Sequence, residues 1–260
     1  MKIPATYHPD ALDRRDARFI QQILPPLEWF TSAYFRLTCE GSLPEGQAPT
    51  LFVSNHNGGI MGPDLFCTLA LLWRRLTPQR PLYALAHDFA MRHFTPLGRQ
   101  LQRVGAIAAH RENASRVLAT GGDLLIYPGG DLDAYRSFKR RNEIVLFPRT
   151  GFVQVAQAHG APIVPIVAYG AHRSAYIFSE GEAIARLLRL QKWARLQRFP
   201  LALALPWIFA PGPWLPYLPL PFQVRLRILP AVRVEKGEDA SEVTLRIQSQ
   251  MQQALHELAT

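Results

Sequence analysis

Short apolar runs alternate with segments of helical periodicity through most of this chain. The apolar runs are of a length that suits buried strands, and they lie at 50–53, 82–86, 104–109, 124–127, 162–168 and 224–228. Helices are predicted between them, at 63–75, 89–103 (with an interruption at Pro96), 112–119 and 150–159. This alternation predicts an α/β fold with a mainly parallel sheet covered by helices.

Both ends of the main alternating region carry predicted helices. Residues 17–38 place apolar side chains at helical spacing, and Pro25-Pro26 is expected to break or kink that helix. Residues 241–258 place apolar side chains on one face and predict an amphipathic closing helix. The fold is therefore expected to have an N-terminal helical segment and a C-terminal amphipathic helix.

The late part of the chain is basic and then rich in proline. Five cations between Arg186 and Arg198 are expected on one helix, with no acid among them. Residues 199–222 hold seven prolines and almost no charge, and seven prolines exclude a long helix. Trp207 and Trp214 favour a membrane interface, so this stretch is expected to lie against lipid head groups or to line an apolar channel. The alternative is a lid that packs on the sheet.

The charge balance indicates which classes of molecule the protein is expected to bind. Hydrophobic residues make up 48% of the 260 residues, which provides for a sizeable core and argues against disorder. Lys and Arg exceed Asp and Glu by nine, and the pI is about 10.0, which favours anionic partners such as nucleic acid, anionic lipid or phosphate-bearing substrates. The alternative is that the charge serves solubility alone. The usual nucleic-acid-binding signatures are missing, so a nucleic-acid partner is not expected.

The number of cysteines and the N-terminal residues indicate the cellular compartment of the protein. Cys39 and Cys67 are too few for a disulfide framework and have no metal-ligand spacing, which indicates a reducing compartment and no bound metal. The first residues are polar and lack the apolar core of a signal peptide. Because no run of about 18 apolar residues occurs, a membrane-spanning helix is not expected.

A histidine follows the first predicted strand, in the segment NHNGGIMGPD. His56 at the carboxyl end of a parallel strand faces the crevice where α/β proteins bind ligands, and the pKa of histidine suits a general base. Asp64 comes eight residues later, at the start of the next predicted helix. A loop that folds back would let this carboxylate orient the imidazole. The alternative is a turn histidine held by local hydrogen bonds.

A second candidate site is YPGGDLDAYRSFKRR, residues 127–141, where two glycines follow a strand and four cations come after them. Backbone N–H groups and cations suit a phosphate or a developing oxyanion, and the alternative is a tight turn beside a solvated basic face. Arg111 is another cation just after a strand end. His87, His110 and His172, the last followed by Arg173, are interpreted as loop or core-edge residues.

Taken together, these motifs resemble the glycerolipid acyltransferases of the phosphate-acyltransferase (lysophospholipid acyltransferase) superfamily. The nearer likeness is to its monoacylglycerol/diacylglycerol acyltransferase-like branch, and it covers roughly residues 36–235. The matching residues form four ordered blocks: Asn55, His56 and Asp64; Gly105, Ile107 and Arg111; Pro128, Gly129, Gly130 and Asp133; and Ile163, Val164, Pro165 and Ile166. The run at 151–166 and the late Leu-Pro-rich stretch are similar to the branch as well.

The resemblance implies an O-acyltransferase of glycerolipid and phospholipid biosynthesis. It would move a fatty acyl group from acyl-CoA or acyl carrier protein to a hydroxyl of a glycerolipid or lysophospholipid, with His56 as general base, Asp64 as its orienting carboxylate and no cofactor. Further residues are then implied to bind substrate: Asn55, Arg111, Pro128, Gly129, Gly130, Asp133, Arg136 and Lys139.

The same resemblance implies a membrane partner. The protein is expected to lie peripherally at a membrane surface, on its cytoplasmic side. Residues 1–40 are interpreted as an N-terminal helical lead-in and a candidate for membrane association, and residues 41–260 as the acyltransferase domain.

Two departures from the family pattern affect the site. The family's usual spacing is His, four residues, Asp, whereas the first carboxylate here is Asp64, and Gly58-Gly59 are expected to let the loop bulge and still deliver it. Just before the acid of the third block the branch usually has an arginine, and this chain has Leu132. Arg136 or Lys139 is expected to replace that arginine.

Two other functions stay open at this point. The altered spacing is compatible with a catalytically inactive, lipid-binding relative. A lipid hydrolase would release free fatty acid without an acceptor lipid, although the chain lacks the Gly-x-Ser-x-Gly elbow of serine hydrolases.

Overall fold

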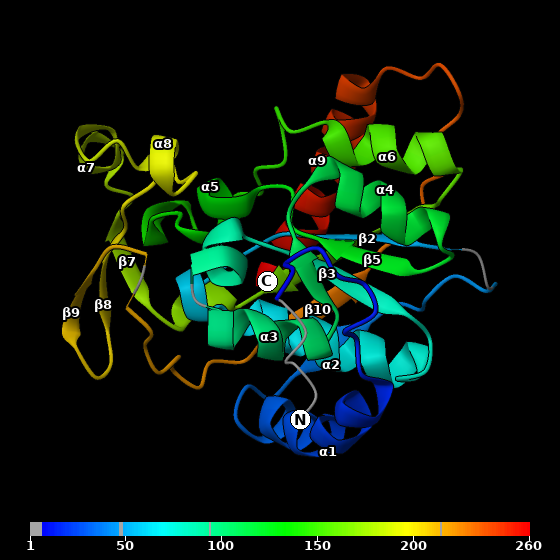
Figure 1. The fold of residues 1–260 in the computed structure, drawn as a ribbon. Coiled ribbons are helices and arrows are strands. Elements are labelled where there is room, and N and C mark those ends of the chain that lie inside the picture. The colour runs from blue at the N-terminus through cyan, green and yellow to red at the C-terminus, as the bar shows by residue number, and fades with distance from the viewer. Residues whose placement is uncertain (1–6, 47–48, 94, 214) are drawn as a thin grey trace.

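The computed structural model describes residues 7–46, 49–93, 95–213 and 215–260, and its centre is a largely parallel sheet (Figure 1). Within the described ranges, seven strands pair in the order β1-β10-β6-β2-β5-β3-β4. Their bounds are Thr38–Glu40 (β1), Leu51–Ser54 (β2), Leu82–Ala86 (β3), Ala106–Ala108 (β4), Asp123–Ile126 (β5), Ile163–Tyr169 (β6) and Arg225–Ile228 (β10). Strands β6, β2, β5, β3 and β4 are parallel, and β10 is antiparallel to β6. The predicted α/β class with a mainly parallel sheet is confirmed.

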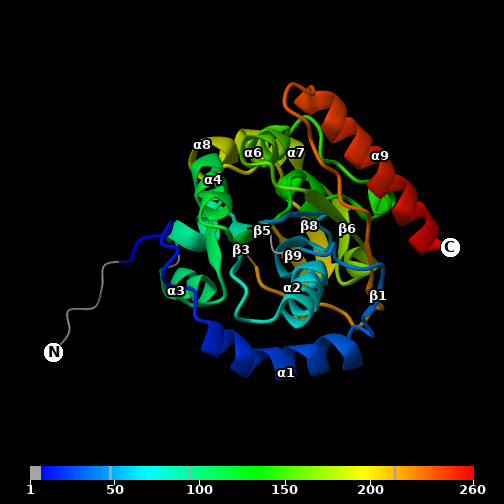
Figure 2. The ribbon, with the colours of Figure 1, turned by 90° about the vertical axis from the view of Figure 1, so that its right-hand side faces the viewer.

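Helices cover both faces of this sheet, as Figure 2 shows. One face carries α4 (Arg111–Ala119), α6 (Gly151–His159) and α9 (Ala240–Ala259), and the other carries α1 (Ala17–Ala33) and α2 (Pro63–Leu76). Successive side chains of β2 point to opposite faces of the sheet. Val53 therefore packs in the hydrophobic cluster with α9, and Phe52 packs in the cluster with α2. The N-terminal helix and the amphipathic closing helix are thus both present.

The N-terminal helix differs from its prediction at the two prolines. Of the break or kink expected at Pro25-Pro26, the break is not found, because α1 is one α-helix with both prolines inside it. Its first turn is capped by Asp16, which accepts a hydrogen bond from the Phe19 amide at 3.0 Å. Ile20 is fully buried beside α2, so tertiary packing outweighs the low helix propensity of proline.

The prediction of one helix from Arg186 to Arg198 is wrong. Two short helices stand in its place, α7 (Glu182–Leu187) and α8 (Leu190–Trp193). Arg189 and Arg195 have positive φ values of 51° and 55°, and each ends the regular helical conformation. Tertiary ion pairs hold this path, since Arg195 contacts Asp88 and Arg198 contacts two glutamates.

A helix was also expected over 89–103 with an interruption at Pro96. The structure has a π-helical turn at Phe89–His93 (η2) and the helix α3 at Thr95–Arg103. Pro96 lies in the first turn of α3, where a missing N–H costs no helical hydrogen bond. Pro96 therefore does not interrupt α3.

A second, smaller sheet lies away from the main one, on the left in Figure 1. It pairs β7 (Tyr176–Ser179), β8 (Leu201–Ala204) and β9 (Ile208–Pro211) in an antiparallel arrangement. Its inner face is buried, whereas Tyr176, Leu203 and Phe209 form an exposed cross-strand row on its outer face. The proline-rich segment thus contains a hairpin, which its sequence did not indicate because both faces are apolar.

Candidate active site

A histidine and an aspartate pair at the carboxyl edge of the parallel strands. His56 follows β2, and its Nδ1 lies 2.8 Å from Oδ2 of Asp64, which is in the first turn of α2. The Asp64 side chain is fully buried and that of His56 is 21% exposed. An Asp64 carboxylate at this atom fixes the tautomer with the proton on Nδ1. Nε2 has no hydrogen-bond partner among the described residues and is left to accept a proton.

The loop between the two residues explains how their unusual spacing still gives contact. Gly58 and Gly59 have φ values of +83° and +72°, in the region that favours glycine. A single 3-10 turn, η1 (Gly59–Met61), follows them and returns the chain to α2. The two extra glycines therefore form a bulge that delivers Asp64 to His56, as the sequence predicted.

Gly62 is needed at this site for a different reason, and the sequence analysis missed it. A Cβ at position 62 would lie 2.4 Å from Oδ1 of Asp64 and 3.2 Å from Cε1 of His56. Glycine is therefore the residue that leaves room for the carboxylate and the imidazole to approach each other. Its only signal in the sequence is its place directly before the proline that starts α2.

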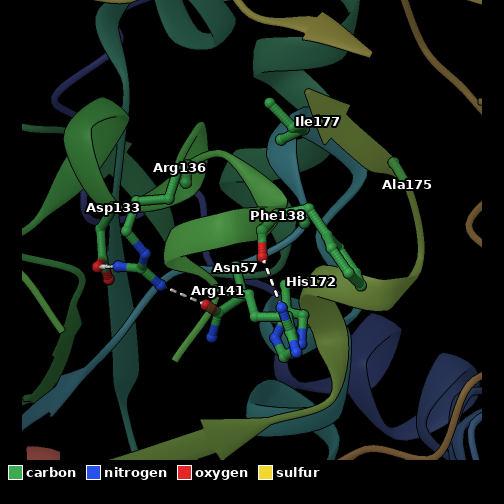
Figure 3. Close-up of a pocket in the computed structure, with 10 residues that line it drawn as sticks. Asn57, Asp133, Arg136, Phe138, Arg141, His172, Ala175 and Ile177 are labelled. Carbon is green, nitrogen blue, oxygen red and sulfur yellow. Dashed lines mark hydrogen bonds and ion pairs between the residues drawn. The ribbon is translucent and has the colours of Figure 1, made fainter. Parts of the chain in front are cut away.

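A buried polar network holds the segment that carries His56. Asn55 bonds both backbone groups of Ala168 in β6, at 2.8 and 2.9 Å, and is fully buried. Asn57 donates to the same Ala168 carbonyl at 3.1 Å and accepts from Nη2 of Arg136 at 2.6 Å (Figure 3). The asparagines on each side of His56 thus tie it to the neighbouring strand.

Asp133 completes this network from the third sequence block. Its Oδ2 accepts a hydrogen bond from the backbone amide of His56 at 2.5 Å, and its Oδ1 accepts from the Val145 amide at 3.3 Å. Asp133 is fully buried and forms an ion pair with Arg136, which is 5% exposed (Figure 3). Burial lowers the pKa of Arg136 to about 10. Both residues therefore position the His56 backbone.

The glycine turn before Asp133 is closely packed. A Cβ at Gly129 would lie 2.4 Å from the Asp133 side chain and from the Val145 carbonyl. Arg149, which the sequence analysis did not single out, donates to the Pro128 carbonyl and to Asp131, both at 3.0 Å. The close packing of the turn therefore accounts for glycine at both positions. Whether the turn also contacts substrate stays a prediction.

Two predicted substrate-binding cations lie apart from this network. Lys139 is exposed on the 3-10 turn η3 (Phe138–Arg140). Arg111 is exposed at the start of α4, after β4, which is three strand positions from β2 and so about 14 Å away at the usual strand spacing. In the described structure neither side chain is hydrogen-bonded or ion-paired to the other predicted site residues.

Comparison with known proteins places the chain in a family. The family model described as diacylglycerol acyltransferase matches residues 26–259. The chain belongs to this family. A mycobacterial relative, an uncharacterized protein of Mycobacterium tuberculosis, is 28% identical over 202 residues, which are 76% of this chain and 56% of that protein. Human diacylglycerol O-acyltransferase 2 is 31% identical over 137 residues, 48% of this chain and 34% of the enzyme.

The chain thus spans about half the length, or less, of the curated relatives it matches. A solved structure with a similar fold is the 1-acyl-sn-glycerophosphate (LPA) acyltransferase PlsC from Thermotoga maritima, with a TM-score of 0.53 and 16% identity over 94% of this chain and 84% of that one. At this identity the likeness concerns the fold. The resemblance to the glycerolipid acyltransferase superfamily, and to its diacylglycerol acyltransferase branch, is confirmed.

Two tyrosines of this family member contact the dyad or its loop, and both were missed in the sequence. The Tyr127 ring lies 4.9 Å from the His56 ring, centroid to centroid, and burial raises the pKa of its hydroxyl. Tyr217 comes from the proline-rich segment, and a Cβ at Gly59 would lie 2.8 Å from its hydroxyl. Tyr217 is buried, and burial raises its pKa as well. The proline-rich segment therefore supports the glycine loop that follows His56.

A small polar cavity lies beside this loop (Figure 3). Asn57, Gly58, Arg136, Arg141 and His172 are among the residues that line it. His172 was interpreted as a loop or core-edge residue, but it is 8% exposed, and neither ring nitrogen has a hydrogen-bond partner in the described residues. Burial lowers its pKa to about 3, so it is neutral near pH 7. No group of three or more His, Cys, Asp or Glu suited to a metal occurs in the described ranges.

Proposed function

We propose that this member of the diacylglycerol acyltransferase family moves a fatty acyl group from an acyl thioester, on coenzyme A or acyl carrier protein, to a hydroxyl of a glycerolipid. The contact between His56 Nδ1 and Asp64 Oδ2, at 2.8 Å, is the observation that carries the proposal. It leaves Nε2 as a base at the carboxyl edge of the parallel strands, where α/β proteins bind their ligands. Family membership supports the same chemistry.

In the proposed step, His56 Nε2 takes the proton from the acceptor hydroxyl while the oxygen attacks the thioester carbonyl carbon. The new C–O bond forms an ester, the C–S bond breaks, and the leaving thiolate takes the proton from the imidazolium. Asp64 stabilises the imidazolium between these two events. General-base assistance of this kind is worth about 10²–10⁴ in rate.

The test is product analysis by mass spectrometry after incubation with labelled acyl-CoA and a panel of acceptor lipids. Transfer that is present in the wild type and lost on replacement of His56 supports the proposal. Free fatty acid formed at the same rate without any acceptor would indicate a lipid hydrolase instead. Lipid binding without turnover would indicate an inactive relative. The division into a lead-in over 1–40 and an acyltransferase domain over 41–260 stays a prediction.

Asp64 is expected to act only through His56. Asp64→Asn should lower turnover by roughly 10²–10⁴-fold, because an amide no longer fixes the tautomer or stabilises the imidazolium. Combined with His56→Ala, it should add almost nothing, since residues that act as one unit are strongly non-additive. Rate constants for the two single variants and the double variant check this. Fully additive losses would mean that Asp64 only stabilises the start of α2.

An apolar patch on the small sheet supports binding to a membrane surface. Its residues are each 40–75% exposed: Tyr176, Phe178, Leu203, Leu205, Trp207, Ile208, Phe209, Leu218 and Phe222. Exposed apolar patches of this extent mark interaction sites. Arg186, Arg189 and Lys192 are exposed just before this segment, and the structure records no ion pair for them in the described residues. We infer that the patch rests on lipid and that these cations attract anionic head groups.

Among the described residues, no helix combines the length and the apolar character that a membrane span requires. Of the two tryptophans predicted to meet the membrane, Trp207 is 49% exposed within the patch, and Trp214 lies outside the described residues. The inference of a peripheral contact therefore depends on the patch and the adjacent cations.

Co-sedimentation with liposomes tests this membrane contact. Binding should rise with the fraction of anionic lipid and fall with added salt, since each cation near the surface contributes about 1 kcal/mol. Trp207→Ala should weaken binding because an interfacial anchor is lost. Leu245→Ala is the matched control, because Leu245 is 48% exposed on α9, away from the patch. Equal binding by both variants, insensitive to salt and lipid charge, would contradict the proposed contact.

A further inference from the structure

The two oxygens of the buried Asp64 carboxylate differ in their contacts. Oδ2 lies 2.8 Å from Nδ1 of His56, whereas Oδ1 is buried and has no hydrogen-bond partner in the described part of the chain. A buried carboxylate oxygen without a donor is unfavourable, and buried polar atoms in native proteins nearly always have a partner. A donor for Oδ1 is therefore expected close to the dyad.

The hydroxyl of Thr68 is placed to be that donor. Thr68 comes four residues after Asp64 in α2, and helical side chains lean toward the N-terminus of their helix, so its side chain approaches that of Asp64. Thr68 is fully buried, and its Oγ1 also lacks a hydrogen-bond partner among the described residues. It thus differs from Thr244, which donates to the Ala240 carbonyl four residues back at 2.7 Å. The O–H of Thr68 stays available for Oδ1 of Asp64.

A second buried hydroxyl, that of Tyr127, lies at the same place. Tyr127 follows β5, and its ring packs 4.9 Å from the His56 ring, centroid to centroid. Its hydroxyl oxygen is buried without a hydrogen-bond partner in the described ranges. Burial raises the pKa of this hydroxyl well above its ordinary value, the nearby Asp64 carboxylate raises it further, and the Thr68 hydroxyl opposes the shift. The Tyr127 hydroxyl therefore stays protonated and can donate a hydrogen bond.

The three unpartnered atoms can satisfy one another in series. A hydroxyl donates one hydrogen bond and accepts others, and its hydrogen rotates to suit its partners. We propose that Tyr127 and Thr68 form a hydroxyl pair that supports the dyad: the Tyr127 O–H donates to Oγ1 of Thr68, and the Thr68 O–H donates to Oδ1 of Asp64. Both are positioning residues, because they act on the reaction through Asp64. This inference rests on the proposed role of His56 as the base in acyl transfer.

The hydroxyl pair affects the protonation of His56. A hydrogen bond donated to Oδ1 stabilises the negative charge of Asp64 and so weakens the attraction of the carboxylate for a proton on His56. When this bond is lost, the attraction becomes stronger and the imidazolium persists to higher pH. The titration of His56 therefore reports whether the hydroxyl pair is present.

The other ionisable groups that act on Asp64 do not change charge near neutral pH. Among the described residues they are Cys67, Arg136 and Tyr217. Burial raises the pKa of the Cys67 thiol and of the Tyr217 hydroxyl, so both stay neutral. Burial lowers the pKa of Arg136 to about 10, so it stays charged, and it is paired with Asp133. A shift in the His56 titration can thus be assigned to the hydroxyl that is removed.

Titration of His56 followed by NMR tests the hydroxyl pair without depending on turnover. Thr68→Val removes the hydroxyl and keeps the shape of the side chain, so the midpoint of the His56 titration should rise by about one pH unit. Thr68→Ser keeps a hydroxyl and should retain the wild-type midpoint. Thr244→Val is the matched control, since Thr244 is equally buried but its hydroxyl bonds within α9. The His56 signal is identified by its loss in His56→Ala.

Tyr127→Phe tests the outer member of the pair. It keeps the ring against His56 and removes the hydroxyl, so the midpoint should rise by a smaller amount than in Thr68→Val. Because Tyr127 acts through Thr68, the double variant should match Thr68→Val alone. An unchanged midpoint in Thr68→Val, or fully additive shifts in the double variant, would overturn the proposal. Should Thr68→Val fail to fold, an unchanged midpoint in Tyr127→Phe would overturn it.

Acyl-transfer kinetics provide a second measurement. In Thr68→Val the acidic limb of the pH profile of kcat should move upward together with the NMR midpoint, so turnover below that midpoint falls about tenfold. KM for both substrates should stay unchanged, because Thr68 is fully buried. A raised KM with an unmoved pH profile would mean that Thr68 only packs in the core. A shifted NMR midpoint in a protein that transfers no acyl group would contradict the proposed function and leave the hydroxyl pair standing.

Discussion

His56→Ala is expected to lower acyl transfer by about 10²–10⁴-fold, because the acceptor hydroxyl loses the base that takes its proton. The fold should stay intact. The His56 side chain is 21% exposed, and its role in the surrounding network is played by its backbone amide, which alanine retains. Initial rates with saturating thioester and acceptor measure the loss, and circular dichroism checks the fold.

His110→Ala provides the matched control for this experiment. His110 also contacts a carboxylate, with its Nε2 3.1 Å from Oδ1 of Asp88, and it is 33% exposed. It lies before α4, beside the edge strand β4, so its replacement should leave turnover nearly unchanged. If His56→Ala retained activity within about tenfold of the wild type, His56 would not be the general base.

Asp133→Ala is expected to destabilise the protein by about 3–5 kcal/mol, because it leaves the Arg136 guanidinium buried and unpaired. Arg136 is 5% exposed, so water does not replace the missing carboxylate. The same change removes the acceptor for the His56 amide, and turnover should fall along with stability. Urea unfolding of the variant and the wild type measures the difference in the free energy of unfolding.

A double variant separates the loss of the ion pair from the loss of the backbone contacts. Arg136→Met removes the buried charge, so Asp133→Ala combined with Arg136→Met should be less destabilised than Asp133→Ala alone. Glu257→Ala, which breaks the exposed contact with Arg227, should change stability little by comparison. Additive losses in the double variant would mean that the two side chains do not depend on each other.

The sequence determined the α/β class, most of the strands and helices of the main sheet, and the identity of the dyad. These features are local: apolar runs of strand length, helical periodicity, and a histidine placed just after a strand end. Parallel strands bring their carboxyl ends to one edge, which is why His56 after β2 and the Pro128–Asp133 turn after β5 meet in the structure. The bulge at Gly58-Gly59 was predictable because two consecutive glycines permit positive φ values.

The roles of the buried polar residues were decided only by the tertiary structure. Asn55, Asp133 and Arg136 have the chemistry of substrate-binding groups in the sequence, and in the structure they hold the main chain around His56. Burial decides between these roles. Burial in turn depends on contacts between distant parts of the sequence, such as the hydrogen bond between His56 and Asp133, which are 77 residues apart.

The strands of the proline-rich segment could likewise not be predicted from its local sequence pattern. Its strands lack the alternation of apolar and polar residues that normally marks a half-buried strand, because the exposed face of the hairpin is apolar as well as the buried one. The contact of Tyr217 with the glycine loop likewise depends on which segments meet in space. The sequence therefore determined the dyad and the layers of the fold, whereas long-range packing decided which polar groups are buried supports and which stay free for a ligand.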